Sequence, residues 1–195
     1  MPYTEKFEDA LVYAARLHRD QTRKGTGVPY VSHLLAVAAI VGENGGTEDE
    51  VVAALLHDAP EDAGGEARLA EIRARFGDGV ADIVAGCTDT YEDPKPPWRA
   101  RKEAYLDHLA GAPAPVRLVS AADKLHNARS VLSDYRAVGE DLWGRFNGGR
   151  DGTLWYYRAV ADALAGDGPV AGELDRVVTE LERLAGNEAS EPGRR

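Results

Sequence analysis

The sequence predicts an all-α protein. Apolar residues recur mostly at spacings of three and four residues, which places them on one face of a helix. We find no run of strict apolar and polar alternation, the pattern that marks a half-buried strand. Clusters of glycine and proline separate the periodic segments, because these residues supply conformations that helices do not tolerate.

The length and composition fit one globular domain. The chain has 195 residues, of which 44% are hydrophobic and 29% charged, and this balance argues against extensive disorder. No stretch approaches the roughly 20 apolar residues that cross a bilayer, and the N-terminus leads into no signal-like segment. We therefore expect a cytoplasmic protein without a membrane partner.

The charged residues and the single cysteine narrow the functional classes. Cys87 cannot form an internal disulfide or a cysteine-based zinc site, so a metal would be held by nitrogen and oxygen; we interpret Cys87 as a core residue. The net charge of -10 disfavours a nucleic-acid partner, which needs an extended basic face. A small anionic ligand remains compatible where local cations or a metal offset the charge. The sequence predicts no oligomeric state.

Two helices are predicted before residue 42. The first is indicated by the spacing of Phe7, Leu11, Ala14 and Ala15. The second is strongly buried and contains Leu34, Leu35, Val37, Ala38, Ile40 and Val41. The glycine-rich segment 42–46 then ends it.

A third helix is predicted to begin at a capping box. The hydroxyl of Thr47 can accept a hydrogen bond from an early amide, and the carboxylate of Glu50 can reach back to the cap. The apolar run 51–56 follows. Because an interior proline removes one backbone hydrogen bond and clashes with the preceding turn, Pro60 predicts that the helix kinks or ends near Ala59.

The remaining helices are predicted from periodic apolar segments at 67–76, 79–87, 98–109, 116–132, 154–164 and 170–184. Glycine and proline predict loops at 93–97, 111–115 and 148–149. There is no repeat and no interdomain linker. We expect residues 1–185 to form one domain and the polar, aperiodic residues 186–195 to form a disordered C-terminal tail.

A histidine and an aspartate stand together at the end of the buried third helix. His57 and Asp58 could ligate one metal ion together. Glu61 lies four residues after His57, and Asp62 four residues after Asp58. In a helix each carboxylate would be one turn away from the pair, where it could accept or donate a proton. A single pair of this kind also occurs by chance, so it needs the support of other motifs.

A polar stripe follows the helix predicted around Asp123. Its core face is marked by Leu118, Leu125 and Leu132. Asp123, Asn127 and Ser130 lie in line on another face and suit a ligand that needs one metal-bound oxygen and several hydrogen bonds. In the alternative interpretation, Asp123 only pairs with Lys124 or Arg129 at the surface.

A loop bounded by glycine and proline precedes His33. It carries Arg23 and Lys24, which could contact a phosphate or stack on a base. The alternative is a solvated turn with two surface cations. Taken alone, His33 also fits a hydrogen-bonded core histidine, and only the combination of motifs favours a metal ligand.

Three blocks of sequence carry a family resemblance. They are His18-Arg19-Asp20-Gln21-Thr22-Arg23-Lys24 with Pro29-Tyr30-Val31-Ser32-His33, then Leu55-Leu56-His57-Asp58-Ala59-Pro60-Glu61-Asp62, then Ala122-Asp123-Lys124-Leu125-His126-Asn127-Ala128-Arg129-Ser130. In this order they resemble the HD-domain metallohydrolases, and within them the stand-alone small alarmone hydrolases related to the hydrolase half of the Rel and SpoT enzymes. The similarity covers roughly residues 7–165.

The resemblance implies an HD-type helical bundle with one divalent ion, usually manganese. Its ligands would be His33, His57, Asp58 and Asp123. Nitrogen and carboxylate ligands also suit Fe, Co, Ni or Zn. The carboxylates that assist hydrolysis would be Glu61 and Asp62. Arg23 and Lys24 would contact the purine or its nearby phosphates. Asn127 and Ser130 would contact the ribose or the 3′ phosphate. Among the aromatic residues 155–157, we take Tyr156 as the one at the pocket.

The implied activity is hydrolysis of the 3′-pyrophosphate of guanosine tetra- or pentaphosphate, which gives GDP or GTP and pyrophosphate. Cations that would stabilise the developing negative charge are Arg23, Lys24 and either Lys124 or Arg150. Other substrates are adenosine 3′-pyrophosphates, NADPH or a nucleoside monophosphate. A metal or nucleotide sensor without turnover is a further alternative, against which the presence of Glu61 and Asp62 argues. We expect no synthetase domain.

Two features depart from the family pattern. Pro60 stands between the HD and ED pairs and puts the placement of Glu61 and Asp62 in question. The segments 91–101 and 143–152 match no pattern of these hydrolases. We interpret both segments as surface loops of a subfamily; alternatively, they reshape the selectivity for purine or phosphate.

Overall fold

The computed structural model describes residues 3–62, 64–92 and 94–189. Over these residues the fold is all α, as the sequence predicts, with no strand and one isolated bridge between Thr22 and Pro29. The helices are α1 Glu5–Leu17, α2 Val31–Glu43, α3 Glu48–Leu56, α4 Ala59–Asp62, α5 Gly65–Phe76, α6 Asp78–Cys87, α7 Trp98–Ala110, α8 Ala114–Val138, the 3₁₀-helix η1 Gly139–Arg145, α9 Gly149–Ala163 and α10 Pro169–Ala189. None of them combines the length and the apolar character that a bilayer span requires.

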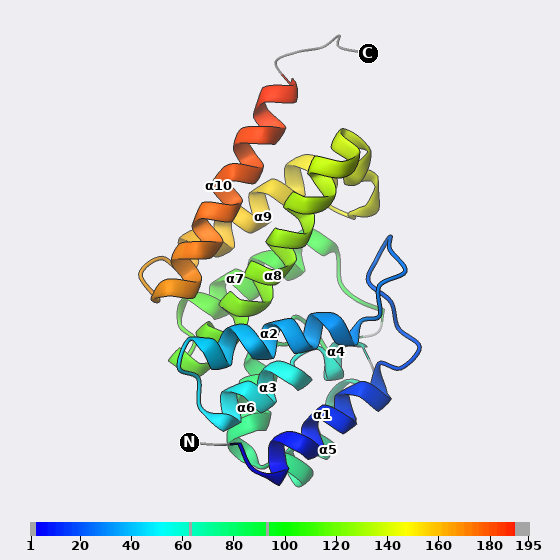
Figure 1. The fold of residues 1–195 in the computed structure, drawn as a ribbon, viewed down its shortest axis with the longest axis vertical. Helices are drawn as coiled ribbons and strands as arrows, with labels where there is room; N and C mark the ends of the chain where they lie inside the picture. The colour runs from blue at the N-terminus through cyan, green and yellow to red at the C-terminus, as the bar shows by residue number, and fades with distance from the viewer. Residues whose placement is uncertain (1–2, 63, 93, 190–195) are drawn as a thin grey trace.

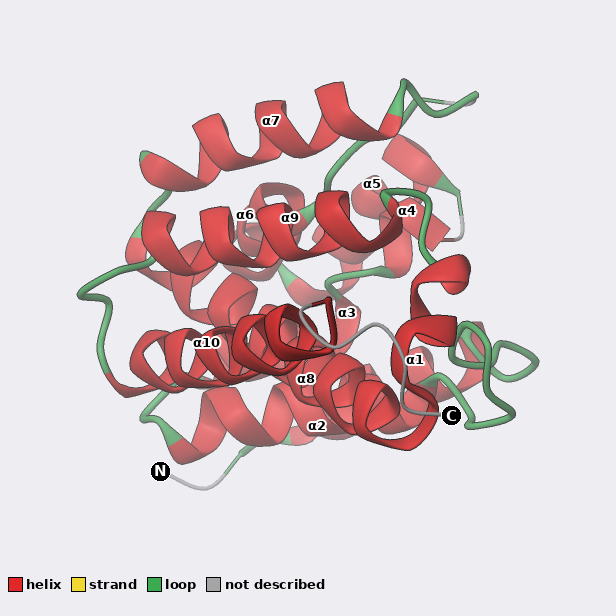
Figure 2. Ribbon diagram, turned by 90° about the horizontal axis from the view of Figure 1, so that it is seen from above, coloured by secondary structure: helices red, strands yellow, loops and turns green. Residues whose placement is uncertain are grey.

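Helix α8 joins the two halves of the bundle (Figure 1). It packs against α2, α3 and α6 of the N-terminal half and against α9, α10 and η1 of the C-terminal half. Within the first half α1 packs on α3 and α5 on α6. In the second half α7 packs on α9 (Figure 2). Polar residues on α8 can therefore meet side chains from both halves.

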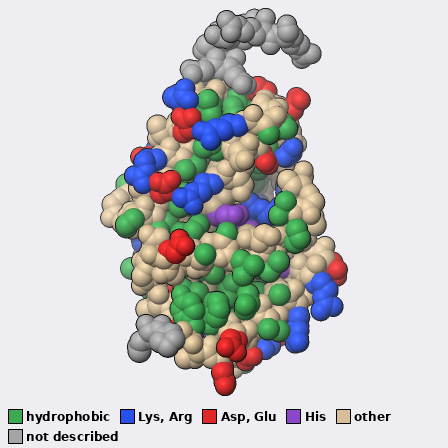
Figure 3. All heavy atoms as spheres, in the orientation of Figure 1, with side chains coloured by type: hydrophobic (Ala, Val, Ile, Leu, Met, Phe, Trp, Pro, Cys, Tyr) green, Lys and Arg blue, Asp and Glu red, His purple; other side chains and the backbone are tan. Residues whose placement is uncertain are grey.

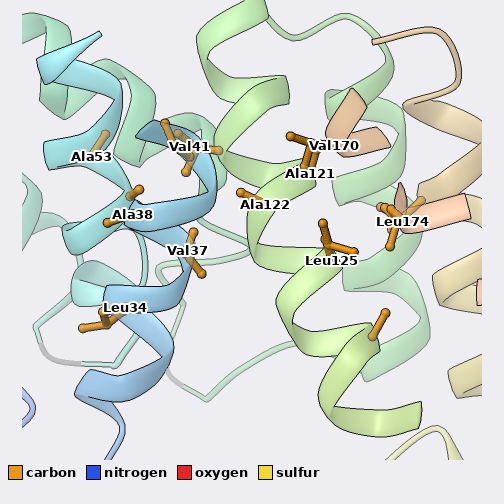
Figure 4. Close-up of a cluster of buried hydrophobic side chains, with 14 of the residues drawn as sticks. Leu34, Val37, Ala38, Val41, Ala53, Ala121, Ala122, Leu125, Val170 and Leu174 are labelled. Carbon is orange, nitrogen blue, oxygen red and sulfur yellow. The ribbon is translucent and has the colours of Figure 1, made fainter. Parts of the chain in front are cut away.

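Small and branched apolar side chains hold α8 between its neighbours (Figure 4). On one side Ala122 faces α2, and on the other Ala121 and Leu125 face α10. The buried partners on those helices include Val37, Val41, Val170 and Leu174. Alanine on α8 lets the helix backbones approach closely, since protein interiors are close-packed. Asp123, the next residue after Ala122, is thereby carried into the interior.

Helix α3 is the most buried helix near the site. All residues from Val51 to Leu56 are buried, and the predicted capping box is confirmed: the Glu50 amide donates to Thr47 Oγ1 at 3.4 Å, and the Thr47 amide donates to Glu50 Oε2 at 2.6 Å. This cap satisfies backbone donors that a helix N-terminus leaves free. It fixes the start of the helix that ends at His57.

Pro60 interrupts the helix as predicted, although three residues earlier than the predicted position near Ala59. Helix α3 ends at Leu56, and the chain restarts as the short α4. The Asp62 amide donates to the Asp58 carbonyl at 3.0 Å, so one helical turn is intact around the proline. Pro60 lies in the first turn of α4, where a missing backbone N–H removes no intrahelical bond.

The segment 143–152 is not the surface loop that the sequence suggested. Its first residues belong to η1, and Trp143 is only 5% exposed. The Trp143 ring lies 5.2 Å from the Tyr135 ring, between centroids. Helix α9 then begins at Gly149, inside the predicted 148–149 loop. Burial of the large indole overrides the local glycine content of this segment.

Other helix ends also differ from the predicted ones. Helix α8 begins at Ala114, inside the predicted loop 111–115, because a proline is compatible with the first turn of a helix. Helix α10 continues to Ala189, so the first residues of the predicted tail 186–195 are helical, and residues 190–195 lie outside the described part of the chain.

We expect Thr47→Ala to lower the free energy of unfolding by about 1 kcal/mol, because the variant loses the side-chain acceptor of the cap. Thr47→Ser keeps a hydroxyl and serves as the control. Urea denaturation of the three proteins measures the effect. An alanine variant as stable as wild type would show that the capping box does not stabilise α3.

Candidate metal centre

The four predicted metal ligands meet at one point between α2, α3 and α8. His33 Nε2 lies 3.2 Å from Asp123 Oδ1 and 3.5 Å from Asp58 Oδ2. His57 Nε2 lies 3.0 Å from Asp58 Oδ2 and 3.6 Å from Asp123 Oδ1. The two histidine nitrogens and the Asp58 oxygen all lie within 4.8 Å of one another. Residues as far apart in sequence as 33 and 123 thus share one cluster.

Both histidines present an Nε2 atom suited to a metal. The rings of His33 and His57 are 1% and 2% exposed, and neither Nε2 has a hydrogen-bond partner among the described residues. His57 Nδ1 lies 2.8 Å from the Ala54 carbonyl, to which it donates, so its Nε2 carries the lone pair. Buried nitrogens without a hydrogen bond, facing two carboxylates, fit a divalent cation.

The charges of the cluster also favour a cation. Burial alone would lower the pKa of His57, but Asp58 and Asp123 raise it well above its ordinary value. Burial alone would raise the pKa of both aspartates, but His57 lowers that of Asp58 and Lys124 lowers that of Asp123. The cluster therefore attracts positive charge, from a proton on His57 or from a metal ion that replaces it.

Hydrogen bonds hold the two aspartates at the same oxygens that face the histidines. The Tyr30 hydroxyl donates to Asp58 Oδ2 at 2.5 Å, and Asn127 Nδ2 donates to Asp123 Oδ1 at 2.5 Å. Lys124 Nζ lies 2.5 Å from the other Asp123 oxygen. The predicted pair of Asp123 and Lys124 is therefore present, but Asp123 is only 5% exposed, so it is no surface ion pair.

His126 is the hydrogen-bond partner of His33. The two Nδ1 atoms lie 2.8 Å apart, so one donates and the other accepts. If His33 Nε2 binds a metal, its Nδ1 carries the proton and His126 Nδ1 accepts it. Burial and the neighbouring His33 lower the pKa of His126 to about 4, which keeps the ring neutral and able to accept.

The two carboxylates of α4 lie beside the cluster with different partners. Gln21 Nε2 donates to Asp62 Oδ2 at 2.8 Å, and Lys95 Nζ lies 2.9 Å from Glu61 Oε1. Burial and the nearby Asp58 raise the pKa of Asp62. Lys95 belongs to the segment 91–101, so at least this part of that segment reaches the site.

The cluster opens into a pocket of about 790 Å³. Its lining includes the predicted residues Arg23, Lys24, Asn127 and Ser130, together with Glu61, Asp62, Lys102 and Lys124. Arg23 also donates to Asn127 Oδ1 at 2.8 Å, which ties the loop before α2 to α8. Figure 3 shows a histidine side chain near the centre of one face with Lys and Arg side chains close to it. Lysine and arginine side chains therefore line the pocket together with carboxylates, in a chain of net charge -10.

Of the aromatic residues 155–157, Tyr157 lines the pocket and the predicted Tyr156 does not. Tyr156 faces α7, where Lys102 Nζ lies 4.9 Å from its ring centre and Trp98 packs at 6.3 Å. Consecutive residues on a helix point about 100° apart, and the sequence alone does not fix the rotation of α9. Tyr157 therefore replaces Tyr156 in the proposed binding set.

Arg150 lies outside the pocket lining and binds elsewhere. It donates to the Ala185 carbonyl at 3.1 Å and pairs with Asp151 at 2.9 Å. Lys124, the other cation predicted to stabilise negative charge, does line the pocket. Arg150 instead ties α9 to α10.

Sequence reasoning assigned no role to several residues that the structure places at the site. Gln21, Tyr30 and His126 lie inside the three motif blocks. The motifs mark these residues, but only the distances in the structure show which side chains they contact. Lys102 and Phe146 lie outside those blocks and no local pattern marks them.

Comparisons with known proteins agree with the geometry. The model of the HD domain family matches residues 10–154. Guanosine-3′,5′-bis(diphosphate) 3′-pyrophosphohydrolase MESH1 of Xenopus tropicalis and that of Homo sapiens are each 38% identical over 126 residues, which cover 63% of this chain and 68% of the relative. A guanosine-3′,5′-bis(diphosphate) 3′-pyrophosphohydrolase of Aquifex aeolicus is 33% identical over 129 residues, which cover 66% of this chain and 18% of the relative.

Solved structures extend the likeness over most of the chain. A structure described as a metazoan ortholog of SpoT that hydrolyzes ppGpp has a TM-score of 0.77 and 28% identity, and the match covers 93% of this chain and 98% of that one. A protein of Listeria monocytogenes has a TM-score of 0.70 and 33% identity, with 77% and 99% covered.

We expect His126→Leu to weaken Mn²⁺ binding by about ten-fold or more, because His33 then loses the acceptor that fixes its ring. His126→Gln offers an amide oxygen and should recover part of the affinity. The exposed His108→Leu is the matched control. Titration calorimetry measures the affinities, and an unchanged value in His126→Leu would contradict the role of His126.

Proposed function

Because this chain belongs to the HD-domain family, we propose that it is a metal-dependent phosphohydrolase that removes the 3′-pyrophosphate from guanosine tetra- or pentaphosphate, the activity for which its MESH1 relatives are named. The observation that carries the proposal is the meeting of two histidines and two aspartates beside Glu61 and Asp62, in a pocket lined by cations. GDP or GTP and pyrophosphate would be the products.

The proposed ion is manganese, held by His33, His57, Asp58 and Asp123. Two imidazoles and two carboxylates form a nitrogen and oxygen donor set, which Mn²⁺ shares with Fe, Co, Ni and Zn. Bound there, a divalent ion would supply Lewis-acid activation of water and of a phosphoryl oxygen. Affinity measurements across these metals decide which one the site prefers.

The side chains around the cluster would divide the remaining work. Asp62, held by Gln21 and with a raised pKa, would take a proton from the attacking water. As water adds to the 3′ phosphorus, the bond from phosphorus to the ribose 3′ oxygen breaks, and that oxygen takes up the proton given off by the water and leaves as the 3′ hydroxyl. Lys102 and Lys124 in the lining would offset the charge of the phosphates.

Other pocket residues would position the nucleotide. Arg23 and Lys24 offer cations for the base or its phosphates, and Asn127 and Ser130 offer hydrogen bonds to the ribose or 3′ phosphate. Tyr157 offers an aromatic face. The pocket, of about 790 Å³, has the size range of small-molecule sites. The cytoplasm is the proposed location.

Product analysis tests the function directly. Guanosine tetraphosphate incubated with the protein and Mn²⁺ should give GDP and pyrophosphate by chromatography, and a chelator should abolish the reaction. Adenosine 3′-pyrophosphates and NADPH run in parallel identify a different substrate. Guanosine tetraphosphate that is bound but left intact would overturn the hydrolase proposal in favour of a sensor.

We expect Asp58→Ala to lose both Mn²⁺ binding and turnover, since Asp58 lies within 3.5 Å of both histidine nitrogens. The exposed Asp107→Ala is the matched control and should retain both. Calorimetry and the product assay provide the two readouts. An active Asp58→Ala protein that binds no metal would contradict the scheme.

The pH dependence tests the role of Asp62. The amide of Gln21 favours the charged carboxylate, so Gln21→Ala should raise the pKa of Asp62 further. Activity that needs the carboxylate would then be lost at a higher pH as the pH falls. The acidic limb of the kcat/KM profile measures the shift, and an unmoved limb would remove Asp62 from the role of base.

A further inference from the structure

The pocket follows one face of α8 away from the metal centre. The lining residues Asp123, Asn127, Ser130 and Asp134 recur at spacings of three and four residues, as one face of a helix requires. From Asp123 to Asp134 the helix rises about 16 Å, at 1.5 Å per residue. The pocket therefore has a far end, at Asp134, that is well separated from the reacting groups.

The far end is walled by η1 and the loop before α2. Arg145 donates to Asp134 Oδ2 at 3.1 Å, and the next residue, Phe146, lines the pocket. Arg145 also lies against Gly25, where a Cβ atom would stand 2.8 Å from Arg145 Cδ. The ion pair thus holds the Asp134 carboxylate in place between two walls. Val131 and Phe146 give this end an apolar surface suited to a base.

A carboxylate here does not suit a phosphate, because like charges repel. It suits hydrogen-bond donors. Guanine presents two adjacent donors, the N1–H and the 2-amino group, and a carboxylate has two acceptor oxygens that match them. Adenine presents the acceptor N1 beside its 6-amino group, so a carboxylate would face a lone pair there.

We propose that Asp134 selects guanine over adenine by accepting hydrogen bonds from N1–H and the 2-amino group of the bound base. The inference rests on the proposed function and adds the specificity of that same pocket. From the metal centre the substrate would extend along α8 through its 3′ phosphate and ribose, which directs its base toward Asp134. Arg145 acts as the positioning residue that orders the carboxylate.

Asp134→Asn is the informative variant. Its carboxamide still accepts one hydrogen bond from guanine but turns a donor toward the other, while the same group pairs with both the N1 and the 6-amino group of adenine. For the guanosine substrate kcat/KM should fall about ten-fold or more, and for the adenosine counterpart it should rise. Asp141→Asn, an exposed carboxylate of η1 outside the pocket lining, is the control and should change neither value.

The experiment measures hydrolysis of guanosine, inosine and adenosine bis(diphosphates) by wild type and both variants. Wild type should prefer guanosine, with inosine between, since it lacks only the 2-amino donor. Equal loss of guanosine and adenosine turnover in Asp134→Asn would show a contact to the ribose or a structural role, and would overturn the inference. So would an unchanged preference.

Binding of GDP and ADP, measured by calorimetry on the same proteins, separates this inference from the proposed function. If wild type hydrolyses no 3′-pyrophosphate, the proposed function fails. A preference for GDP over ADP that Asp134→Asn reverses would still support the selection of guanine by Asp134. If guanosine tetraphosphate is hydrolysed and the purines bind equally in all variants, the function stands and the role of Asp134 is wrong.

Discussion

The meeting of two carboxylates and two imidazoles in a buried volume is the constraint on which the rest of the site depends. Asp58 and Asp123 both lie within 3.6 Å of His57 Nε2. Two buried negative charges need a compensating cation. The same two carboxylates raise the pKa of His57, because they stabilise its protonated form. A divalent metal ion meets this demand with ligand chemistry as well as with charge.

The packing of α2, α3 and α8 brings these four side chains together. The alanines of α8 let α2 and α10 approach on its two sides, so that Asp123 reaches the cluster from the interior of a long helix. Helix α3 ends just before His57, which frees the backbone to turn and present His57 and Asp58 side by side. Pro60 is compatible with this turn, because it lies in the first turn of α4, the short helix that carries Asp62 to the site.

The sequence was sufficient for the fold class and for the residues of the cluster, because each lies in a short block whose residue types imply their chemistry. It was insufficient where the answer depends on how elements rotate or dock. Tyr156 and Tyr157 have the same chemistry, and only the rotation of α9 decides which one faces the pocket. Trp143 lies in a glycine-rich segment, and its burial comes from η1 folding back onto Tyr135 at the end of α8. The contacts of Lys95 with Glu61, and of Arg145 with Asp134, join segments with no periodic relation.

In this net acidic protein, lysine and arginine side chains line the pocket beside the proposed metal centre, where an anionic substrate would bind. The most direct test of that centre is the anomalous signal of manganese in crystals grown with Mn²⁺. We predict one strong peak within roughly 2.0–2.3 Å of His33 Nε2, His57 Nε2 and an oxygen each of Asp58 and Asp123, at the distances usual for nitrogen and oxygen ligands. A manganese ion bound elsewhere in the chain, with these four side chains engaged only with one another, would contradict it.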